Sequence, residues 1–404
     1  MLNAKNEREL CYVVRVDEIK PIEGRDRVEC AVVGGWTIMV RKDQFKPGDL
    51  GIYFEIDSQV PEKEPFMFLE AKHFKIKTQK YKTPDGQFWS QGLLMHAEDF
   101  GWEMLDDSIA DDEKNLHFDE GDTRFLTEKL GVTYAVAEDN SRKAGSVDKY
   151  KKMAQRNGKL FAHQPFRWLM RHEWGKKLLF VFFGKKKDKK GGWPEWVAKT
   201  DEERIECIPY RLTNKDPWIA TEKIDGTSTT FTMKRGKWGK NDFYVCSRNV
   251  VFDKPNKNCF YDTNVYIEMA EKYNVENVLA SILSDNPDLD WVTLQGETYG
   301  AGIQRRDYGL TEHRFMGFNF ITSKEGRWNS VRAAKFIENY NIPWVPILDE
   351  NYVLPDTIEE LRAFSHSEGS RIDGEIKEGI VFRSQDGSMS FKCVDPDFLM
   401  KYHN

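Results

Sequence analysis

Hydrophobic and polar residues alternate in short runs over the first hundred residues, which is the pattern of half-buried β-strands. These runs are rich in β-branched and aromatic residues, and Gly-Gly and Pro-Gly-Asp signals separate them. The predicted strands are 10–16, 27–33, 36–41, 50–56 and 73–77. A further turn is predicted at 84–86. Five or six short strands with regular turns indicate a small closed β-barrel.

An OB-fold is the natural candidate for a barrel of this size, because it closes most of its strand edges and commonly binds nucleic acid. A barrel with a purely structural role would show the same strand pattern. The pattern therefore predicts the fold class of this region and leaves its role open.

The second half of the chain changes to a mixed pattern of strands and helices. The predicted strands are 218–220, 228–233, 243–246, 291–295 and 314–321, and the predicted helices are 264–273, 278–283, 330–339 and 359–364. Because the strands and helices do not alternate in regular βαβ units, the pattern indicates an α+β domain.

Length and local charge divide the chain further. At 404 residues the chain exceeds the size at which one core keeps growing, so at least two domains are expected. We predict an OB-like domain over 1–140, a basic and partly helical linker over 141–192, and a second domain over 193–404. Basic residues beside aromatics in 141–192 can hold phosphates and stack bases. A solvated linker whose aromatics pack between domains fits the same composition.

The six cysteines are scattered and form neither a CxxC pair nor a cluster with histidines, so neither a disulfide framework nor a structural zinc site is expected. The sequence shows no signal peptide and no apolar run near the roughly 20 residues that span a bilayer. We therefore expect an intracellular protein, cytoplasmic or nuclear, that is neither secreted nor held in a membrane.

Candidate chemistry begins at the run TEKIDG, in which Lys223, Asp225 and Gly226 form a Lys-x-Asp-Gly motif. A lysine attacks phosphorus only when it is neutral, so Lys223 needs cationic neighbours or a metal to lower its pKa. The expected sources of this positive charge are Lys392, Arg248 and a bound Mg²⁺. Lys223 and Asp225 share one side of a strand, and Gly226 lets the chain turn and leaves room for a ligand.

An ordered series of motifs follows this lysine. It consists of Ser-Arg-Asn at 247–249, Gly-Glu-Thr-Tyr-Gly at 296–300, Phe-Met-Gly-Phe-Asn-Phe at 315–320, Glu-Gly-Ile-Val-Phe-Arg at 378–383 and Ser-Phe-Lys at 390–392. Asp225, Glu297 and Glu378 come from three separate segments, and Mg²⁺ prefers such oxygen ligands together with substrate phosphates. Each residue alone is compatible with a structural role, whereas the ordered set indicates nucleotidyl transfer.

These residues together resemble the covalent nucleotidyltransferase superfamily of RNA ligases, DNA ligases and capping enzymes. The resemblance implies that Lys223 is the lysine that becomes adenylated and that Lys392 contacts the α-phosphate. It also implies that Glu378 organises the metal, and that Arg248 and Glu297 contact the ribose or metal-bound waters. Glu222 is expected beside the cofactor. Phe318, with Phe320 as the alternative, is expected to stack on the purine.

The segment 199–205 resembles the stretch that precedes the adenylated lysine in many RNA ligases. DNA ligases and capping enzymes place their OB domain after the last motif, whereas only about a dozen residues follow Lys392 here. The order of domains is therefore similar to the fifth RNA ligase family, which carries an N-terminal OB module. One departure is visible: some members have a Lys-x-Lys pair in the last motif, and here Cys393 and Val394 follow Lys392.

The resemblance implies an ATP-dependent RNA ligase that uses Mg²⁺ or Mn²⁺. Lys223 would take AMP from ATP, AMP would pass to a 5′-phosphate, and a 3′-OH of RNA would then close the break. The expected partner is RNA with these ends, in a nicked duplex, without an obligate protein partner. The alternatives are a capping-type guanylyltransferase that uses GTP, and an inactive OB protein that binds nucleic acid.

Overall fold

The computed structural model describes residues 1–4, 7–84, 86–106, 115–118, 124–135, 193–236, 240–252 and 264–403, with Leu169, His172 and Leu179 as single residues. Met1–Ala135 and Trp193–Asn404 form one compact unit. The predicted basic linker, 141–192, lies outside the described residues apart from those three. The predicted domain bounds stay predictions.

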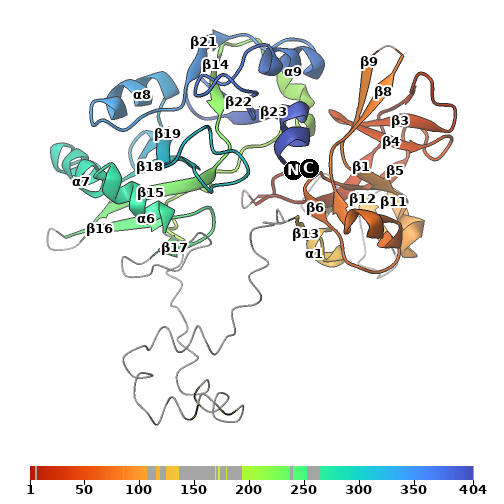
Figure 1. The fold of residues 1–404 in the computed structure, drawn as a ribbon, viewed down its shortest axis with the longest axis horizontal. Helices are drawn as coiled ribbons and strands as arrows, with labels where there is room; N and C mark the ends of the chain where they lie inside the picture. The colour runs from red at the N-terminus through yellow and green to blue at the C-terminus, as the bar shows by residue number, and fades with distance from the viewer. Residues whose placement is uncertain are drawn as a thin grey trace. The chain divides into compact units, whose positions relative to one another are not determined.

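The N-terminal domain consists mainly of short antiparallel strands (Figure 1). They are β1 (Cys11–Arg15), β2 (Glu18–Pro21), β3 (Val28–Val33), β4 (Trp36–Arg41), β5 (Leu50–Phe54), β6 (Ser58–Gln59), β7 (Lys75–Ile76), β8 (Gln79–Thr83), β9 (Gly86–Ser90), β10 (Leu93–Met95), β11 (Glu103–Asp106), β12 (Asn115–Phe118) and β13 (Thr133–Tyr134). The helical turns are η1 (Phe66–Lys72), η2 (Ala97–Phe100) and α1 (Thr127–Leu130). The strands pair in the orders β1-β5-β10, β2-β3-β4 and β13-β6-β7.

Strand β1 is buried on both faces, which explains its continuous apolar sequence. Cys11 and Val13 point into one core, while Tyr12 and Val14 point into another. Successive side chains of a strand point to opposite sides, so one strand serves two layers of packing. This double burial fits a barrel wall that is covered on both sides.

Four of the five strands predicted in this domain correspond to β1, β3, β4 and β5. The fifth, predicted over 73–77, is reduced to the two residues of β7. The hairpin of β8 and β9, joined at the predicted turn near Pro84, was not predicted as strands. Its first strand, Gln-Lys-Tyr-Lys-Thr, lacks a buried apolar face, which explains why its hydrophobic signal is weak.

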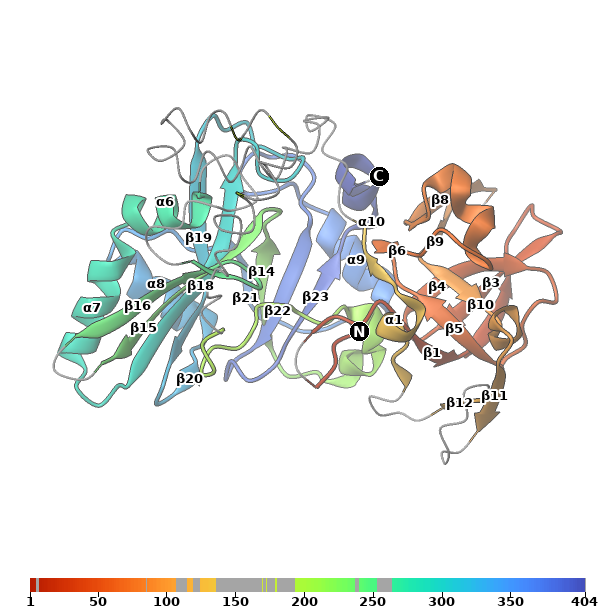
Figure 2. The same cartoon turned by 90° about the horizontal axis from the view of Figure 1, so that it is seen from below.

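The C-terminal domain has two sheets (Figure 2). One has the order β17-β16-β15-β18-β19-β20 and the other the order β21-β14-β22-β23. The strands are β14 (Trp218–Lys223), β15 (Thr227–Arg235), β16 (Asn241–Cys246), β17 (Val251–Phe252), β18 (Trp291–Gly300), β19 (His313–Thr322), β20 (Gly326–Arg327), β21 (Ile347–Tyr352), β22 (Gly379–Ser384) and β23 (Ser390–Val394). The helices and turns are η4 (Ile205–Cys207), η5 (Pro209–Thr213), α6 (Val265–Lys272), α7 (Val275–Asp285), α8 (Ser330–Glu338), α9 (Ile358–His366), α10 (Pro396–Phe398) and the π-helical turn η7 (Leu399–His403).

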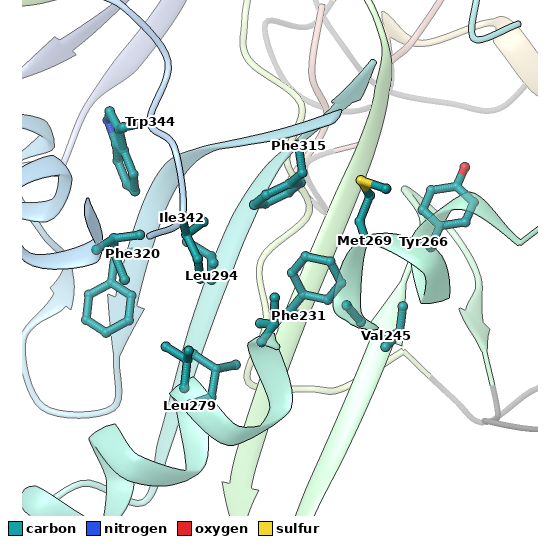
Figure 3. Packing of buried hydrophobic residues seen from close by; sticks show 14 of the residues in the cluster. Phe231, Val245, Tyr266, Met269, Leu279, Leu294, Phe315, Phe320, Ile342 and Trp344 are labelled. Atoms are coloured by element: carbon teal, nitrogen blue, oxygen red, sulfur yellow. The ribbon is translucent and has the colours of Figure 1, made fainter. Parts of the chain in front are cut away.

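Helices α6, α7 and α8 cover the larger sheet and build the main core with it. Phe231 of β15 packs edge-on against Phe315 of β19, with ring centroids 5.2 Å apart, and Figure 3 shows both beside Met269 of α6. The strands and helices predicted in this domain from the sequence all correspond to observed elements, but 218–220 and 291–295 cover only half of β14 and β18. Strands β17, β20, β21, β22 and β23 were not predicted. The α+β class follows from this arrangement.

Helix α9 covers the smaller sheet. Its Ile358 and Leu361 pack against Ala220, Ile380 and other residues on one side of β14 and β22. The alternate residues of these strands point to the opposite side, which we call the site face.

No helix in the described part of the chain is long and apolar enough to cross a membrane.

Candidate active site

The site face brings together residues from three neighbouring strands. In the antiparallel pairing, Lys223 of β14 lies opposite Gly379 of β22, and Thr221 lies opposite Val381. Val381 in turn lies opposite Lys392 of β23. Because partners in register point to the same side, Lys223 and Lys392 share the site face. The strand pattern thus places two widely separated lysines on one surface.

Lys223 lies among carboxylates. Its Nζ is 2.7 Å from Oε2 of Glu378. Burial lowers the pKa of Lys223, but Glu378, then Glu297 and Asp225 outweigh burial and raise it above its usual value. The expected cationic surroundings are therefore not found in the chain by itself. The carboxylates hold the ammonium protonated, and the amine needs a change in its surroundings before it attacks.

The two cations expected to surround Lys223 are paired with Asp201 instead. Lys392 Nζ lies 2.9 Å from Asp201 Oδ1. Arg248 forms an ion pair through Nη2 with the other oxygen, Oδ2. Burial would raise the pKa of Asp201, but Lys392, Arg248 and Arg8 hold it well below its usual range. One carboxylate thus compensates both cations.

The three carboxylates predicted to bind metal all raise the pKa of Lys223. Burial raises the pKa of Glu297 to about 8, against the attraction of Lys223. Burial also raises the pKa of Glu378. Asp225 is 3% exposed, and within the described residues its Oδ2 has no hydrogen-bond partner. A buried carboxylate oxygen without a partner is costly, and a cation would satisfy it.

These carboxylates fit an ion that keeps several waters and takes phosphate oxygens, as Mg²⁺ does. A tighter group lies elsewhere: ligand atoms of His366, Asp395 and Asp397 lie within 4.8 Å of one another. There, however, Lys80 pairs with Asp397 at 2.6 Å, and Asp395 accepts a backbone N–H at the start of α10. That group is therefore explained by local structure.

Comparison with known families agrees with this geometry. Residues 216–403 match the family model described as RNA ligase. The C-terminal domain is thus similar to the RNA ligase family over residues 216–403. Residues 10–96 match a model described as an OB-fold domain. The predicted fold class, with an OB-fold domain before an RNA ligase domain, and the predicted enzyme class are confirmed.

Solved structures of an RNA ligase from Naegleria gruberi have the same fold. The structure with PPi superposes with a TM-score of 0.69 at 23% identity, covering 98% of this chain and 99% of that one. A mutant with ATP and Mn superposes with a TM-score of 0.68 at 22% identity, over 98% and 100% of the two chains. Another mutant with AMP and Mn gives 0.68 at 23% identity, over 98% and 99%. A comparison with curated protein sequences gives no match.

In the RNA ligase domain, a β-bulge presents Phe318. The pairing of β18 with β19 passes from Gln295–Asn319 to Gly296–Gly317, so Phe318 is the extra residue. Phe318 is half-buried, and the Arg383 guanidinium carbon lies 5.6 Å from its ring centroid. The alternative, Phe320, is fully buried against Trp328 and Phe336 and has no free ring face for a base.

Glu222 lies on the other side of β14 from Lys223. The Ser370 hydroxyl donates to Glu222 Oε1, and the Arg371 backbone N–H donates to Oε2 over 2.8 Å. Burial raises the pKa of Glu222. Glu222 thus anchors the loop before β22, and its contact with a nucleotide stays a prediction.

Gly226 of the motif is required by close packing. A Cβ at this position would lie 2.4 Å from the Thr298 carbonyl oxygen and 2.9 Å from Glu297 Cγ. The backbone of the Lys-x-Asp-Gly motif therefore passes directly against β18. This approach places Gly226 beside Glu297 of β18.

Several residues at the site were not predicted from the sequence. Asp201 belongs to the segment 199–205 that the resemblance singled out, but nothing in the sequence marked it as the partner of Lys392 and Arg248. Tyr308 accepts the Asp225 backbone N–H over 2.7 Å, and His403 Nε2 lies 3.4 Å from Asp225 Oδ1. Asp225 raises the pKa of His403 against the effect of burial. Neither residue stands in a motif that would have marked it.

Proposed function

We propose that this chain is an ATP-dependent RNA ligase that carries AMP on Lys223. It transfers the AMP to a 5′-phosphate and joins that end to a 3′-OH of RNA. The observation that carries the proposal is the convergence on the site face: Lys223 sits 2.7 Å from Glu378, and Lys392 and Arg248 converge on one anionic group. Solved relatives in complex with ATP, AMP and PPi support the choice of nucleotide.

The first step is an exchange at the α-phosphorus. Lys223 Nζ gives up a proton and forms a bond to phosphorus, and the bond from phosphorus to the pyrophosphate oxygen breaks. Glu378 is the nearest acceptor for that proton, because its Oε2 already contacts Nζ. Lys392 and Arg248 balance negative charge on the phosphate, which is the main requirement of phosphoryl transfer.

We assign the divalent metal to Asp225, Glu297 and Glu378. When bound, Mg²⁺ or Mn²⁺ supplies positive charge beside the phosphate and the lysine. The same charge favours the ionised forms of Glu297 and Glu378, whose pKa values burial has raised. Asp225 is held for this role by Tyr308 through its backbone N–H.

The second and third steps reuse the same residues. The 5′-phosphate of the RNA attacks the α-phosphorus of the lysyl-AMP, and the bond from phosphorus to Lys223 Nζ breaks. The 3′-OH then attacks the activated 5′-phosphate, and AMP leaves. Both steps place negative charge near Lys392 and Arg248.

We propose a nicked duplex as the substrate, held in part by the OB-fold domain. The β8–β9 hairpin carries interleaved basic and aromatic residues that suit nucleic acid. Lys80 Nζ lies 4.6 Å from the Trp89 ring centroid, and Arg25 lies 5.0 Å from that of Tyr81. Five cysteines are free in the described residues, which supports a reducing, intracellular location. We propose no obligate protein partner.

The test is covalent labelling. The protein is incubated with Mg²⁺ and with ATP or GTP labelled at the α-phosphate, and is then denatured. Label from ATP is expected on the wild type and on Lys401→Ala, a control whose lysine forms an exposed ion pair with Glu375 at 2.8 Å. Lys223→Ala is expected to retain none.

Each alternative function has its own outcome in this test. Label from GTP alone would identify a capping-type guanylyltransferase. No label from either nucleotide would indicate an inactive protein that binds nucleic acid. Labelled wild type that seals single strands but not a nicked duplex would reject the proposed substrate while keeping the ligase chemistry.

A further inference from the structure

Asp201 occupies an unusual position at the site. It stands between Lys392 and Arg248 and gives one carboxylate oxygen to each. Its side chain is 9% exposed, as is that of Lys392, so the ion pair to Lys392 is shielded from solvent. Arg8 adds a third cation that acts on the same carboxylate.

The two partners of Asp201 are the cations that the proposed ligase chemistry directs to the nucleotide. A phosphate oxygen and a carboxylate oxygen make the same kind of charge-assisted hydrogen bond to lysine and arginine. Asp201 therefore marks a point where one anionic group is held by both cations. A phosphate bound there would compete with Asp201 for the same donors.

The surrounding contacts also show that Lys392 and Arg248 are anchored independently of Asp201. The backbone N–H of Lys392 donates to the Glu203 carbonyl over 2.7 Å, and Lys392 lies within β23. The guanidinium of Arg248 lies 5.6 Å from the ring centroid of Tyr134. Departure of the Asp201 carboxylate would leave both cations near their places.

We propose that Asp201 is an internal counter-anion that compensates the charges of Lys392 and Arg248 until a nucleotide phosphate takes its place. The inference rests on the proposed function, because it takes the incoming anion to be the phosphate of ATP or AMP. It adds a residue that no motif of the nucleotide-binding series contains. Breaking a buried ion pair is costly unless another anion replaces the first, so the exchange keeps both cations compensated.

A different role for Asp201 predicts the opposite result. If Asp201 were a permanent anchor that orients Lys392 and Arg248 toward the phosphate, its removal would weaken nucleotide binding. If it is a displaceable counter-anion, its removal strengthens binding, because the phosphate no longer competes with it. The sign of the change therefore decides between the two roles.

The experiment measures AMP binding by calorimetry without divalent metal, for wild type, Asp201→Asn and Asp356→Asn. Asp356 forms an exposed ion pair with Lys215 at 2.8 Å and serves as a matched control. Asp201→Asn is expected to bind AMP roughly tenfold more tightly and to unfold at a lower temperature without ligand. Asp356→Asn is expected to match the wild type in AMP affinity. Unchanged or weaker binding by Asp201→Asn overturns the proposal.

A second measurement applies if Asp201→Asn does not fold. In a crystal structure of the wild-type protein with AMP, the Asp201 carboxylate is expected to have left Lys392 Nζ, with the phosphate in its place. A retained contact between Asp201 and Lys392 beside bound AMP overturns the proposal. Failure of the proposed function is distinguishable, since the wild type would then bind no AMP and form no covalent adduct.

Discussion

The carboxylates around Lys223 lead to a prediction about its proton. Glu378→Gln removes the charge nearest to Lys223 Nζ, at 2.7 Å, while the side chain keeps its size. Coulomb's law at this distance gives ~6 kcal/mol for an effective dielectric constant near 20 and ~1.5 kcal/mol in bulk water. The side chains are 24% and 11% exposed, so the true value lies between these limits. One pKa unit corresponds to ~1.4 kcal/mol, so the pKa of Lys223 should fall by at least ~1 unit.

The assay follows the rate at which an amine-directed reagent modifies Lys223 across pH, with peptide mass mapping to identify the lysine. Glu375→Gln is the control, because Glu375 forms a pair of similar length, 2.8 Å, with the exposed Lys401. It should leave the Lys223 profile unchanged. If Glu378→Gln also leaves the profile unchanged, or moves it to higher pH, the carboxylates do not hold this proton and the reasoning fails.

Three further changes test other parts of the site. Burial raises the pKa of Glu297 to about 8, so wild-type stability should fall as pH rises from the ordinary carboxyl range through that value. Glu297→Gln should therefore gain stability over the wild type in thermal unfolding, below about 1 kcal/mol at about pH 5 and about 4–5 kcal/mol at about pH 9. A gain that does not grow with pH would contradict this. Phe318→Ala should weaken AMP binding roughly tenfold or more with little loss of stability, whereas Phe320→Ala should cost about 3–5 kcal/mol in denaturant unfolding; the reverse ranking would reject Phe318 as the stacking residue. Gly226→Ala should slow adduct formation strongly, because its Cβ would lie 2.4 Å from the Thr298 oxygen, and adduct formation at the wild-type rate would show that this close packing is not needed.

The start of the strand that carries Lys223 could be predicted from the sequence, over 218–220, because alternation is a local property; β14 continues from there to Lys223. Alternation and motif spacing predicted one side of a strand for Lys223 and Asp225, whereas β14 ends at Lys223 and Asp225 follows it. They also indicated an OB-fold domain before a ligase domain. The partners of Lys392 and Arg248 could not be predicted, since Asp201 lies 191 and 47 residues away in the chain. The pairing of both cations with Asp201 therefore emerged only from the folded structure.

The partial exposure of Phe318 at a β-bulge also could not be predicted from the sequence. A run with three phenylalanines offers several candidates, and only the bulge in β19 separates the half-buried Phe318 from the buried Phe320. A bulge depends on the pairing with β18 and leaves no clear signal in β19 alone. The packing therefore favours Phe318 over Phe320, and its stacking role stays a prediction.

Lys223 is proposed as the carrier of AMP, and one measurement tests this most directly. The protein is incubated with ATP and Mg²⁺, digested, and the AMP-bearing peptide is identified by mass. We expect a single adduct, on Nζ of Lys223, that disappears when nicked RNA with a 5′-phosphate is added. An adduct on Lys392, on Lys377 or on any other residue, with Lys223 unmodified, would contradict it.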